Sequence, residues 1–196
     1  MATSINVPRY FIDCGGHNSC SARIFRKLYD PKCKTHIYSF EIEPTFWPYY
    51  KSIPNHTLIK KAVWIENGEM EFYKDSEKRK AGGSLIKKTG EHRHKTKPIM
   101  VETIDISVWL IENFSRVDSI DLKMDIEGAE YQVIPRMIET GAFAVISRFM
   151  IEWHWYKIGM PEEEHKEVFT SVPASQLKWP GVENAEKILG KKYWKK

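Results

Sequence analysis

The sequence contains no long apolar run and little cysteine, and each absence excludes some classes of protein. Its 196 residues include no stretch of about 18 consecutive apolar residues, which a membrane-spanning helix requires. The opening residues, MATSINVPRYFID, lack the basic and apolar regions of a secretory signal peptide. We therefore expect a cytoplasmic protein with no membrane span.

The three cysteines, Cys14, Cys20 and Cys33, form no Cys-x-x-Cys pair and are odd in number. This count and spacing argue against a disulfide framework and against a structural zinc site. A reducing compartment is the simplest setting for such a chain. We expect each cysteine to serve as a small packing residue in the interior.

Glycine and proline are also scarce, at 11 and 10 residues, which excludes collagen-like and low-complexity chains. Hydrophobic residues make up 42% of the chain, which argues against wholesale disorder. The length predicts a single domain over residues 1–196. Within it we expect a motif-bearing core at about 9–156 and a C-terminal helix and tail at 157–196.

Positive charge is in small excess, because 30 Lys and Arg against 26 Asp and Glu give a net charge of +4. The excess lies in residues 74–97 and in the tail GKKYWKK. A solvated loop and a frayed terminus are the simpler interpretation. A patch that binds a phosphate-rich or otherwise acidic partner is the alternative.

Short apolar runs alternate with helical patterns along the chain. Segment 20–29 places Ile24, Phe25 and Leu28 at helical spacing, and Pro31 stops it. Strands are expected at 9–13, 35–41, 57–64, 69–74, 99–104, 119–125 and 143–155, and further helices at 106–114, 127–140 and 162–171. This order predicts an α/β fold in which helices cover both faces of a mostly parallel sheet.

Acidic residues follow directly after several predicted strands, in the segments FIDCGG, SFEIEP, KMDIEG and MIEWH. Ligands of open parallel sheets bind beyond the carboxyl ends of the strands. Gly15 and Gly16 let the backbone pass close to a ligand, and Asp13 can accept from an ammonium group. Glu41 suits the paired hydroxyls of a ribose. S-adenosylmethionine carries both an ammonium group and a ribose. The acids and glycines that follow several strands together favour a site for this ligand over a tight turn with incidental acids.

Seven segments occur in order over roughly residues 9–156, namely FIDCGGHNS, IYSFEIEP, KKAVWIENGEMEFY, GGSL, VETID, IDLKMDIEGAE and FMIEWHW. In this order and spacing the chain resembles the FkbM family of S-adenosylmethionine-dependent methyltransferases. The most specific of the segments is LKMDIEGAE. The resemblance implies a class I methyltransferase fold, a Rossmann-like three-layer sandwich whose mostly parallel central sheet has seven strands.

The resemblance also implies which residues contact the cofactor. They are Asp13, Gly15, Gly16, His17, Asn18, Glu41, Ala62, Val63 and Asp125. The chain departs from the family's glycine turn, DxGANxG, at two positions. His17 replaces the Asn and Ser19 replaces the last Gly. Its FEIEP stands for FEPxP, so Glu41 rather than Glu43 is the expected ribose ligand. After residue 156 no final strand pair is recognisable.

Methyl transfer to an alcohol oxygen requires loss of the hydroxyl proton, so a base or a metal ion is expected near the acceptor. The catalytic candidates follow the later strands of the sheet and are Asp125, Glu127, Glu152 and His154, with Glu130 beside them. Asp125 suits helix capping or cofactor positioning as well as acceptor binding. His154 has a pKa suited to a base and shares a strand face with Glu152.

The spacing of these residues is no metal signature, so no metal is predicted. Asp125, Glu152 and His154 remain a minority alternative as ligands of Mg²⁺ or Mn²⁺. Lys123 is unusual within a strand, and alternation places it on the same face as Asp121 and Asp125. We expect it to pair with one of them.

The resemblance points to an O-methyltransferase that acts on a hydroxyl group of a sugar, a glycan or a small natural product. An alternative is a nucleic-acid-binding or nucleic-acid-modifying methyltransferase that uses the basic segment 74–97. The acids at the expected ligand edge disfavour a phosphate track there. A non-catalytic cofactor-binding subunit is a third possibility. The sequence indicates no oligomeric state.

Overall fold

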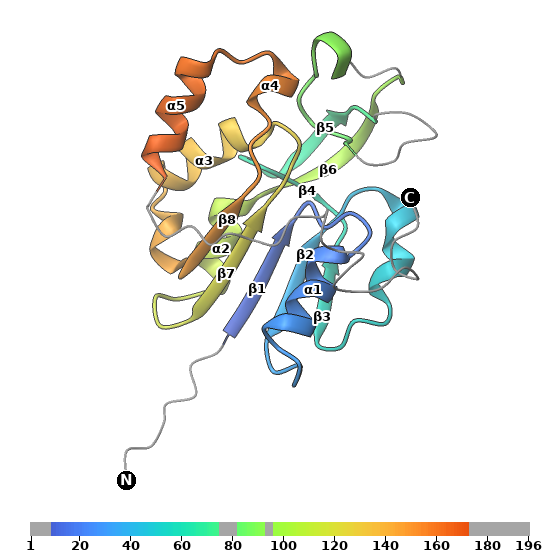
Figure 1. The fold of residues 1–196 in the computed structure, drawn as a ribbon, viewed down its shortest axis with the longest axis vertical. Helices are drawn as coiled ribbons and strands as arrows, with labels where there is room; N and C mark the ends of the chain where they lie inside the picture. Colours follow the sequence, from blue (N-terminus) through green and yellow to red (C-terminus); the bar gives the residue numbers. More distant parts are fainter. Residues whose placement is uncertain (1–8, 75–81, 93–95, 173–196) are drawn as a thin grey trace.

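The computed structural model describes residues 9–74, 82–92 and 96–172. A central sheet is built from β1 (Arg9–Cys14), β2 (His36–Phe40), β3 (His56–Ile59), β7 (Ser119–Met124) and β8 (Arg148–Ile151). These strands lie in the order β3-β2-β1-β7-β8 and are all parallel (Figure 1). The predicted α/β class with a parallel Rossmann-like sheet is therefore confirmed.

A second, smaller sheet contains β4 (Ala62–Trp64), β5 (Gly68–Phe72) and β6 (Ile99–Asp105), in the order β4-β6-β5. Strand β4 is parallel to β6, whereas β5 is antiparallel to it. The edge strand predicted at 69–74 is therefore confirmed.

Helices lie on both faces of the central sheet. They are α1 (Cys20–Leu28), α2 (Ile106–Asn113), α3 (Glu130–Glu139), α4 (Trp155–Ile158) and α5 (Glu162–Ser171), with 3₁₀ turns η1 (Pro44–Tyr50), η2 (Gly90–His92) and η3 (Ala142–Val145). Helix α1 lies over one face, and α2 and α3 over the other (Figure 1).

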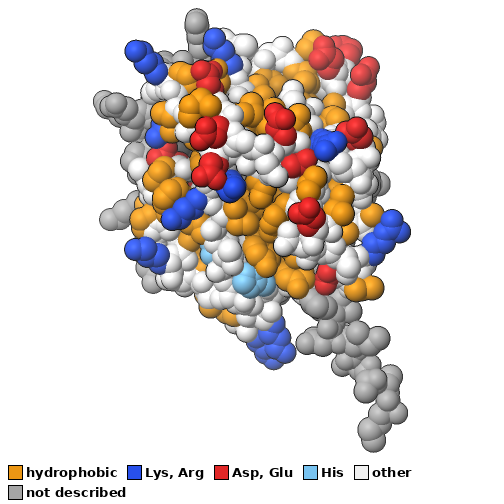
Figure 2. Space-filling view, turned by 180° about the vertical axis from the view of Figure 1, so that it is seen from behind, with side chains coloured by type: hydrophobic (Ala, Val, Ile, Leu, Met, Phe, Trp, Pro, Cys, Tyr) orange, Lys and Arg blue, Asp and Glu red, His pale blue; other side chains and the backbone are white. Residues whose placement is uncertain are grey.

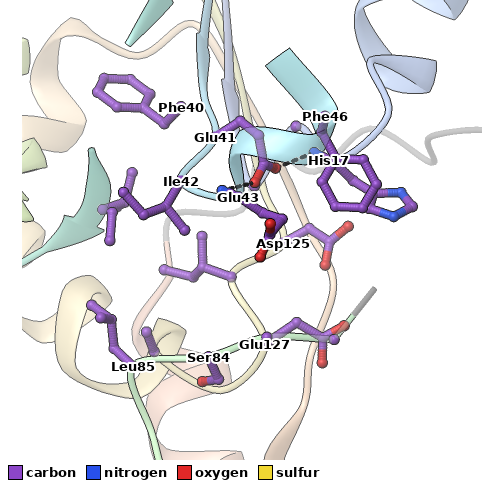
Figure 3. Close-up of a pocket in the computed structure, with 18 of the residues that line it drawn as sticks. His17, Phe40, Glu41, Ile42, Glu43, Phe46, Ser84, Leu85, Asp125 and Glu127 are labelled. Carbon is purple, nitrogen blue, oxygen red and sulfur yellow. Dashed lines mark hydrogen bonds between the residues drawn. The ribbon is translucent and has the colours of Figure 1, made fainter. Parts of the chain in front are cut away.

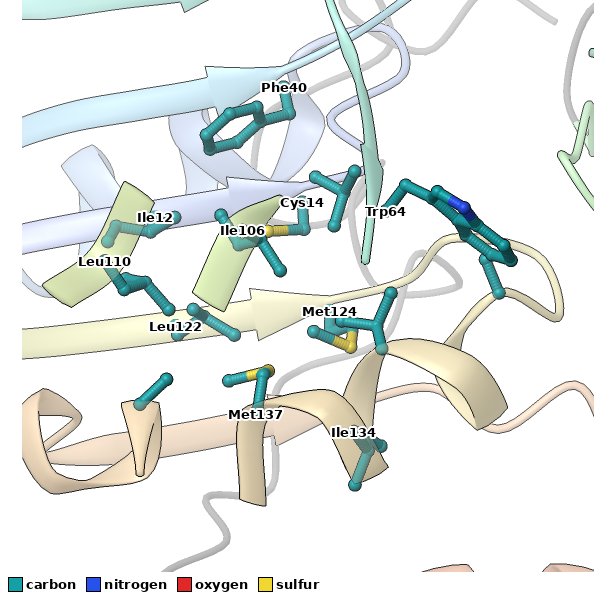
Figure 4. Packing of buried hydrophobic residues seen from close by; sticks show 14 of the residues in the cluster. Ile12, Cys14, Phe40, Trp64, Ile106, Leu110, Leu122, Met124, Ile134 and Met137 are labelled. Atoms are coloured by element: carbon teal, nitrogen blue, oxygen red, sulfur yellow. The ribbon is translucent and has the colours of Figure 1, made fainter. Parts of the chain in front are cut away.

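The core explains these layers, because successive residues of β1 point to opposite faces of the sheet. Phe11 stacks on Phe25 of α1, with ring centroids 4.3 Å apart. Ile12 and Cys14 face the other way and belong to the cluster that includes Leu110 of α2 (Figure 4). Burying a large apolar side chain completely contributes about 1.5–3 kcal/mol, so the two clusters fix the sheet between its helices.

Local signals explain where α2 begins. Asp105 ends β6, and its side chain accepts hydrogen bonds from the backbone N–H groups of Ser107 and Val108 at 2.9 and 3.1 Å. An aspartate at this position satisfies N–H groups that the first helical turn leaves free. The helix therefore starts directly after the strand.

Two of the predicted strands are wrong in detail. The run 57–64 forms two strands rather than one, because the chain leaves β2 after Ile59 and Ala62–Trp64 pairs with β6. The run 143–155 is not one long strand. It begins as η3 after Gly141 at a φ of +74°, pairs with β7 only over Arg148–Ile151, and turns into α4. An apolar run alone does not separate a buried strand from a buried turn.

Other expectations concern the helices and the chain end. The helix predicted at 127–140 is α3, which runs unbroken through Pro135. The predicted surface helix at 162–171 is confirmed as α5. Within residues 9–172, less the two gaps, the central sheet has five strands rather than the seven implied by the resemblance. Of the basic segment 74–97, residues 75–81 and 93–95 lie outside the described residues, as does the basic tail.

The cysteines are all free, and Cys14 and Cys20 are buried as expected. Cys33 is only partly buried and has a φ of +51°, which corrects the expectation that it packs in the interior. None of the helices in the described ranges is both long enough and apolar enough to span a membrane.

Candidate active site

A cavity of about 980 Å³ opens at the carboxyl ends of β1, β2 and β7. Ligands of parallel sheets bind at this edge. The predicted site residues that line it are Gly15, Gly16, His17, Asn18, Glu41, Ala62, Val63, Asp125, Glu127 and Glu152. Asp13 and His154 do not line it and lie buried behind its wall. The structure therefore brings the predicted residues together, and their individual roles stay predictions.

The turn after β1 requires glycine for steric reasons. Gly15 has a φ of +82°, and a Cβ atom there would lie 1.8 Å from the carbonyl oxygen of Asp125. A Cβ atom at Gly16 would lie 2.2 Å from the hydroxyl oxygen of Tyr50. The N–H groups of both glycines donate to the Phe40 carbonyl oxygen, at 3.2 and 3.1 Å. The turn therefore closes tightly against β2 and against the loop after β7.

The two departures from the family's glycine turn both have positive φ, at 46° for His17 and 67° for Ser19. Such a conformation costs a non-glycine residue about 1–2 kcal/mol, and local contacts offset it. The His17 ring packs edge-on against Phe46, with centroids 4.1 Å apart, and the Tyr50 hydroxyl donates to its carbonyl oxygen. Burial lowers the pKa of His17. His17 thus presents a neutral ring to the cavity.

Glu41 lies where β2 ends and is buried in the cavity wall (Figure 3). Its Oε2 atom accepts from the His17 N–H at 2.6 Å, and its Oε1 atom accepts from the Glu43 N–H at 2.7 Å. Burial raises the pKa of Glu41 to about 8, although both N–H groups act in the opposite direction. A carboxylate oxygen has two lone pairs, so each Glu41 oxygen keeps one for a further donor.

An apolar section of the wall lies beside Glu41. It is formed by Phe40, Ile42, Ala62, Val63, Phe72 and Leu85. Figure 3 shows Phe40, Ile42 and Leu85 along one side of the cavity and His17 with Phe46 along the other. Ile42 and Leu85 were not predicted as site residues, although both belong to family segments, SFEIEP and GGSL. Such a section suits a flat aromatic ring.

Asp13 is fully buried beneath the glycine turn. The Lys123 Nζ atom lies 3.2 Å from Asp13 Oδ1 and 3.1 Å from Asp125 Oδ2, and it donates to the Gly15 carbonyl oxygen at 2.8 Å. Burial raises the pKa of Asp13, and Lys123 opposes that shift. The carboxylates of Asp125 and Asp13 outweigh the effect of burial on Lys123 and raise its pKa. This buried group joins β1, β7 and the turn.

The sequence predicted that Lys123 pairs with Asp121 or Asp125, and the structure shows that Asp125 is the partner. Asp121 pairs instead with Arg9 and Arg148 at another part of the sheet. Lys123 thus belongs to the site.

His154 is fully buried and lies just before α4 rather than within a strand. Its Nδ1 atom lies 2.9 Å from Glu130 Oε1, which also accepts from the Ile126 N–H. Its Nε2 atom has no hydrogen-bond partner in the described part of the chain. The carboxylate oxygens nearest to Nε2 belong to Glu152, at 3.5 Å, and Asp125, at 3.8 Å. Burial opposes protonation, but the carboxylates of Glu130, Glu152 and Glu127 raise the pKa of His154 to about 10.

Glu127 has a φ of +58° and lies between two lysines. The Nζ atoms of Lys88 and Lys157 lie 2.6 and 2.8 Å from its Oε2 atom. Burial alone would raise the pKa of Glu127, but His154 and the two lysines lower it to about 2. Neither lysine was predicted from the sequence as a site residue. Lys157 could have been found from its position three residues after His154. Nothing in the sequence distinguishes Lys88 from the other basic residues of its segment.

Asp125, Glu127 and His154 each offer one metal-ligating atom, and these atoms all lie within 4.8 Å of one another. The minority alternative drawn from the sequence named Glu152 in place of Glu127. The Glu152 side chain is 58% exposed and stands at the rim of this group.

A family model described as Methyltransferase FkbM domain matches residues 13–175. The match begins in β1, at Asp13, and extends past the end of α5. A search of curated proteins found no match, and neither did a search of solved structures. Because the family model covers most of the sequence, the chain belongs to the FkbM methyltransferase family.

Proposed function

We propose that this chain is an S-adenosylmethionine-dependent O-methyltransferase that acts on a hydroxyl group of a sugar, a glycan or a small natural product. The observation that carries the proposal is a single cavity lined by Glu41 and the glycine turn and also by Asp125, Glu127 and Glu152. The family supplies the reaction class. The cavity supplies two different sets of polar groups, as a cofactor and an acceptor require.

The residues present fit the cofactor. Glu41 is a buried carboxyl group that, in its ionised form, has a free lone pair on each oxygen, which suits the two hydroxyls of a ribose. Ala62 and Val63 belong to the apolar section that suits the adenine. The turn from Gly15 to Asn18, together with Asp125, would hold the amino-acid end. When bound, S-adenosylmethionine supplies a methyl group on a positively charged sulfur.

On the acceptor side, the chain's own residues orient the hydroxyl and take up its proton. Asp125 and Glu152 line the cavity as carboxylates, and Glu152 has its pKa lowered by its neighbour His154. Lys88 and Lys157 fix the carboxylate of Glu127. Accurate placement of reacting groups contributes up to about 7–11 kcal/mol to a transfer reaction, so most of the work of these residues is positioning.

Aromatic groups near the acceptor residues support a sugar as the substrate class. His92 lines the cavity, and its ring lies 5.6 Å from that of Tyr156, centroid to centroid. Tyr156 is exposed. Exposed aromatic rings beside polar groups suit the apolar face and the hydroxyls of a sugar ring.

A nucleic-acid acceptor finds less support. Carboxylates of Asp125, Glu127 and Glu152 line the cavity, and they repel phosphates. Acidic and basic side chains are interspersed on the face shown in Figure 2 rather than gathered in a basic track. Residues 75–81, 93–95 and the basic tail lie outside the described residues.

We also infer that residues 1–196 form one methyltransferase domain that acts in the cytoplasm. The family model covers 13–175, which supports one domain. The free Cys14, Cys20 and Cys33 support a reducing compartment.

The function is tested by methyl transfer. The purified full chain is mixed with S-adenosylmethionine that carries a tritiated methyl group and with panels of glycans, small alcohols and RNA. We expect label on a glycan or an alcohol and none on RNA. Calorimetry should also show binding of S-adenosylhomocysteine. Absence of that binding would overturn the cofactor assignment, and transfer to RNA alone would overturn the acceptor assignment.

A further inference from the structure

Three potential metal ligands meet at the wall of the cavity, from two separate segments. Asp125 and Glu127 lie in the loop after β7, and His154 lies before α4. One donor atom from each lies within 4.8 Å of the other two. Neighbouring ligands of an octahedral Mg²⁺ ion, each at about 2.1 Å, lie about 3 Å apart. A cation would therefore draw the more distant of these donors together by up to about 2 Å.

An unpartnered buried nitrogen points to a ligand at the same place. His154 is fully buried, and its Nε2 atom, which lies 3.8 Å from Asp125 Oδ1, has no hydrogen-bond partner among the described residues. Its Nδ1 atom faces Glu130, whose carboxylate is fixed by the N–H groups of Ile126 and Gly128. Histidines that bind metals have this arrangement, in which a carboxylate accepts the far ring N–H and the other nitrogen faces the metal.

The lysines around the cluster leave one oxygen available on each carboxylate. Lys123 pairs with Oδ2 of Asp125, and Lys88 and Lys157 both pair with Oε2 of Glu127. In the described ranges no ion pair involves Glu127 Oε1, and Asp125 Oδ1 faces only His154. A cation would therefore compete with no lysine for these two oxygens.

The charges of the cluster leave room for a divalent cation. The carboxylates are those of Asp13, Asp125, Glu127, Glu130 and Glu152, and the ammonium groups are those of Lys88, Lys123 and Lys157. The carboxylates outnumber the ammonium groups by two, and a histidine that binds a metal does so through a deprotonated nitrogen.

We propose that Asp125, Glu127 and His154 bind one divalent cation of the hard, oxygen-preferring class to which Mg²⁺ and Mn²⁺ belong. The use of this cation rests on the proposed function, because the acceptor hydroxyl would lie in the same cavity. A cation there would bind the hydroxyl oxygen and favour loss of its proton. Glu152 is outside the ligand set and exposed, so it is the carboxylate left to accept that proton.

Mn²⁺ binding tests the site without any acceptor. The full chain is treated with EDTA, dialysed and titrated with MnCl₂, and free Mn²⁺ is followed by electron paramagnetic resonance. We expect one bound ion per chain and a nitrogen coupling from His154 in the pulsed spectrum. Asp125→Asn and Glu127→Gln should each weaken binding by about tenfold or more. His154→Gln should abolish the nitrogen coupling.

Two further variants separate this ligand set from its alternatives. Glu91→Gln removes an exposed carboxylate from the same cavity and should leave Mn²⁺ affinity unchanged. Glu152→Gln removes the ligand that sequence spacing had suggested, and we expect less than about a threefold loss. A loss from Glu152→Gln as large as that from Glu127→Gln would overturn the assignment.

The outcomes distinguish the cation from the proposed function. If the wild-type chain binds S-adenosylhomocysteine but no Mn²⁺ at millimolar concentration, the cation site is wrong and the function stands. If it binds Mn²⁺ but no S-adenosylhomocysteine, the site stands and the function is wrong. Where His154→Gln fails to fold by circular dichroism, Asp125→Asn and the wild-type nitrogen coupling still decide the question.

Discussion

Two groups of residues line the same cavity and are held in different ways. In the glycine-turn group, Gly15, Gly16, His17 and Glu41 are fixed by backbone hydrogen bonds and by close steric contact. In the charged group, Asp125, Glu127, His154, Lys88 and Lys157 are fixed by ion pairs between segments distant in sequence. The first group tolerates almost no change of shape, whereas the second depends on its balance of charge.

The difference predicts different responses to substitution. A close steric contact is lost at once when an atom is added. An ion pair in a cluster has neighbours that compensate in part when one member is removed, unless the remaining charges are deeply buried. We therefore expect the largest effects in the glycine turn and the smallest at the edge of the charged group.

Substitution Gly15→Ala should have the largest effect on stability. The new Cβ atom would lie 1.8 Å from a backbone oxygen, and the φ of +82° adds strain. We expect a loss of about 4 kcal/mol or more in the free energy of unfolding, measured by urea denaturation. The matched control is Gly141→Ala, at a φ of +74° with no atom within 4 Å of the added Cβ. It should lose only about 1–2 kcal/mol. Equal losses in the two variants would show that steric contact is not what fixes the turn.

Lys123 contacts both groups, through Gly15 and Asp125, so Lys123→Met tests whether the groups are independent. The substitution leaves Asp13 and Asp125 without their shared cation and removes a hydrogen bond to Gly15. Removal of one partner of a buried pair costs about 3 kcal/mol or more, and we expect a loss of about 3 kcal/mol. The double variant Lys123→Met/Asp13→Asn should recover part of it. If it recovers nothing, the buried pair is not the source of the loss.

The glycine-turn group is also the part of the site that the sequence predicted best. Gly15, Gly16 and Glu41 follow strands directly, and their roles depend on local backbone geometry that a short motif records. The parallel sheet follows from the same strand and helix alternation. Ile42 and Leu85 escaped notice because apolar residues are common and their meeting depends on the folded chain.

The charged group was harder to predict because its pairs depend on the tertiary fold. Strand alternation put Glu152 beside His154, but the strand ends at Ile151. Glu127, which has a positive φ, instead lies in the loop that brings its carboxylate to the cluster. Lys88 lies in a basic segment in which solvent exposure is the usual expectation, yet it is buried.

Glu41 should make the glycine-turn group sensitive to pH. Its folded pKa of about 8 lies above the ordinary value of 4.5, so the folded state holds a proton that the unfolded state releases. The resulting stability is complete below pH 4.5 and is lost as the pH rises towards 8. The difference in unfolding free energy between wild type and Glu41→Gln should fall by about 3–4 kcal/mol from pH 5 to pH 8.

The comparison with Glu41→Gln cancels the other groups that face Glu41, namely Asp13, Lys123 and Tyr50. Glu43→Gln is the matched control from the same loop, and the change for Glu41→Gln should be the larger of the two. A level difference for Glu41→Gln would mean that the carboxylate is already ionised at pH 5.

The smallest effect is expected at Lys157, at the edge of the charged group. Its ammonium shares Glu127 Oε2 with Lys88 and is partly exposed, so Lys157→Gln should cost less than about 1 kcal/mol in unfolding free energy. The same substitution removes a positive charge beside the proposed cation site. We therefore expect Mn²⁺ to bind about three- to tenfold more tightly.

The direction of this last change is what makes it informative, because a substitution that merely loosened the cavity would weaken cation binding. Lys166→Gln is the matched control, since Lys166 pairs with Glu162 on the exposed surface of α5 and should leave Mn²⁺ affinity unchanged. Tighter binding in Lys157→Gln alone would show that the charged group is governed by its local sum of charge. Weaker binding would mean that Lys157 holds Glu127 in place as rigidly as the backbone holds Glu41, and the contrast between the two groups would disappear.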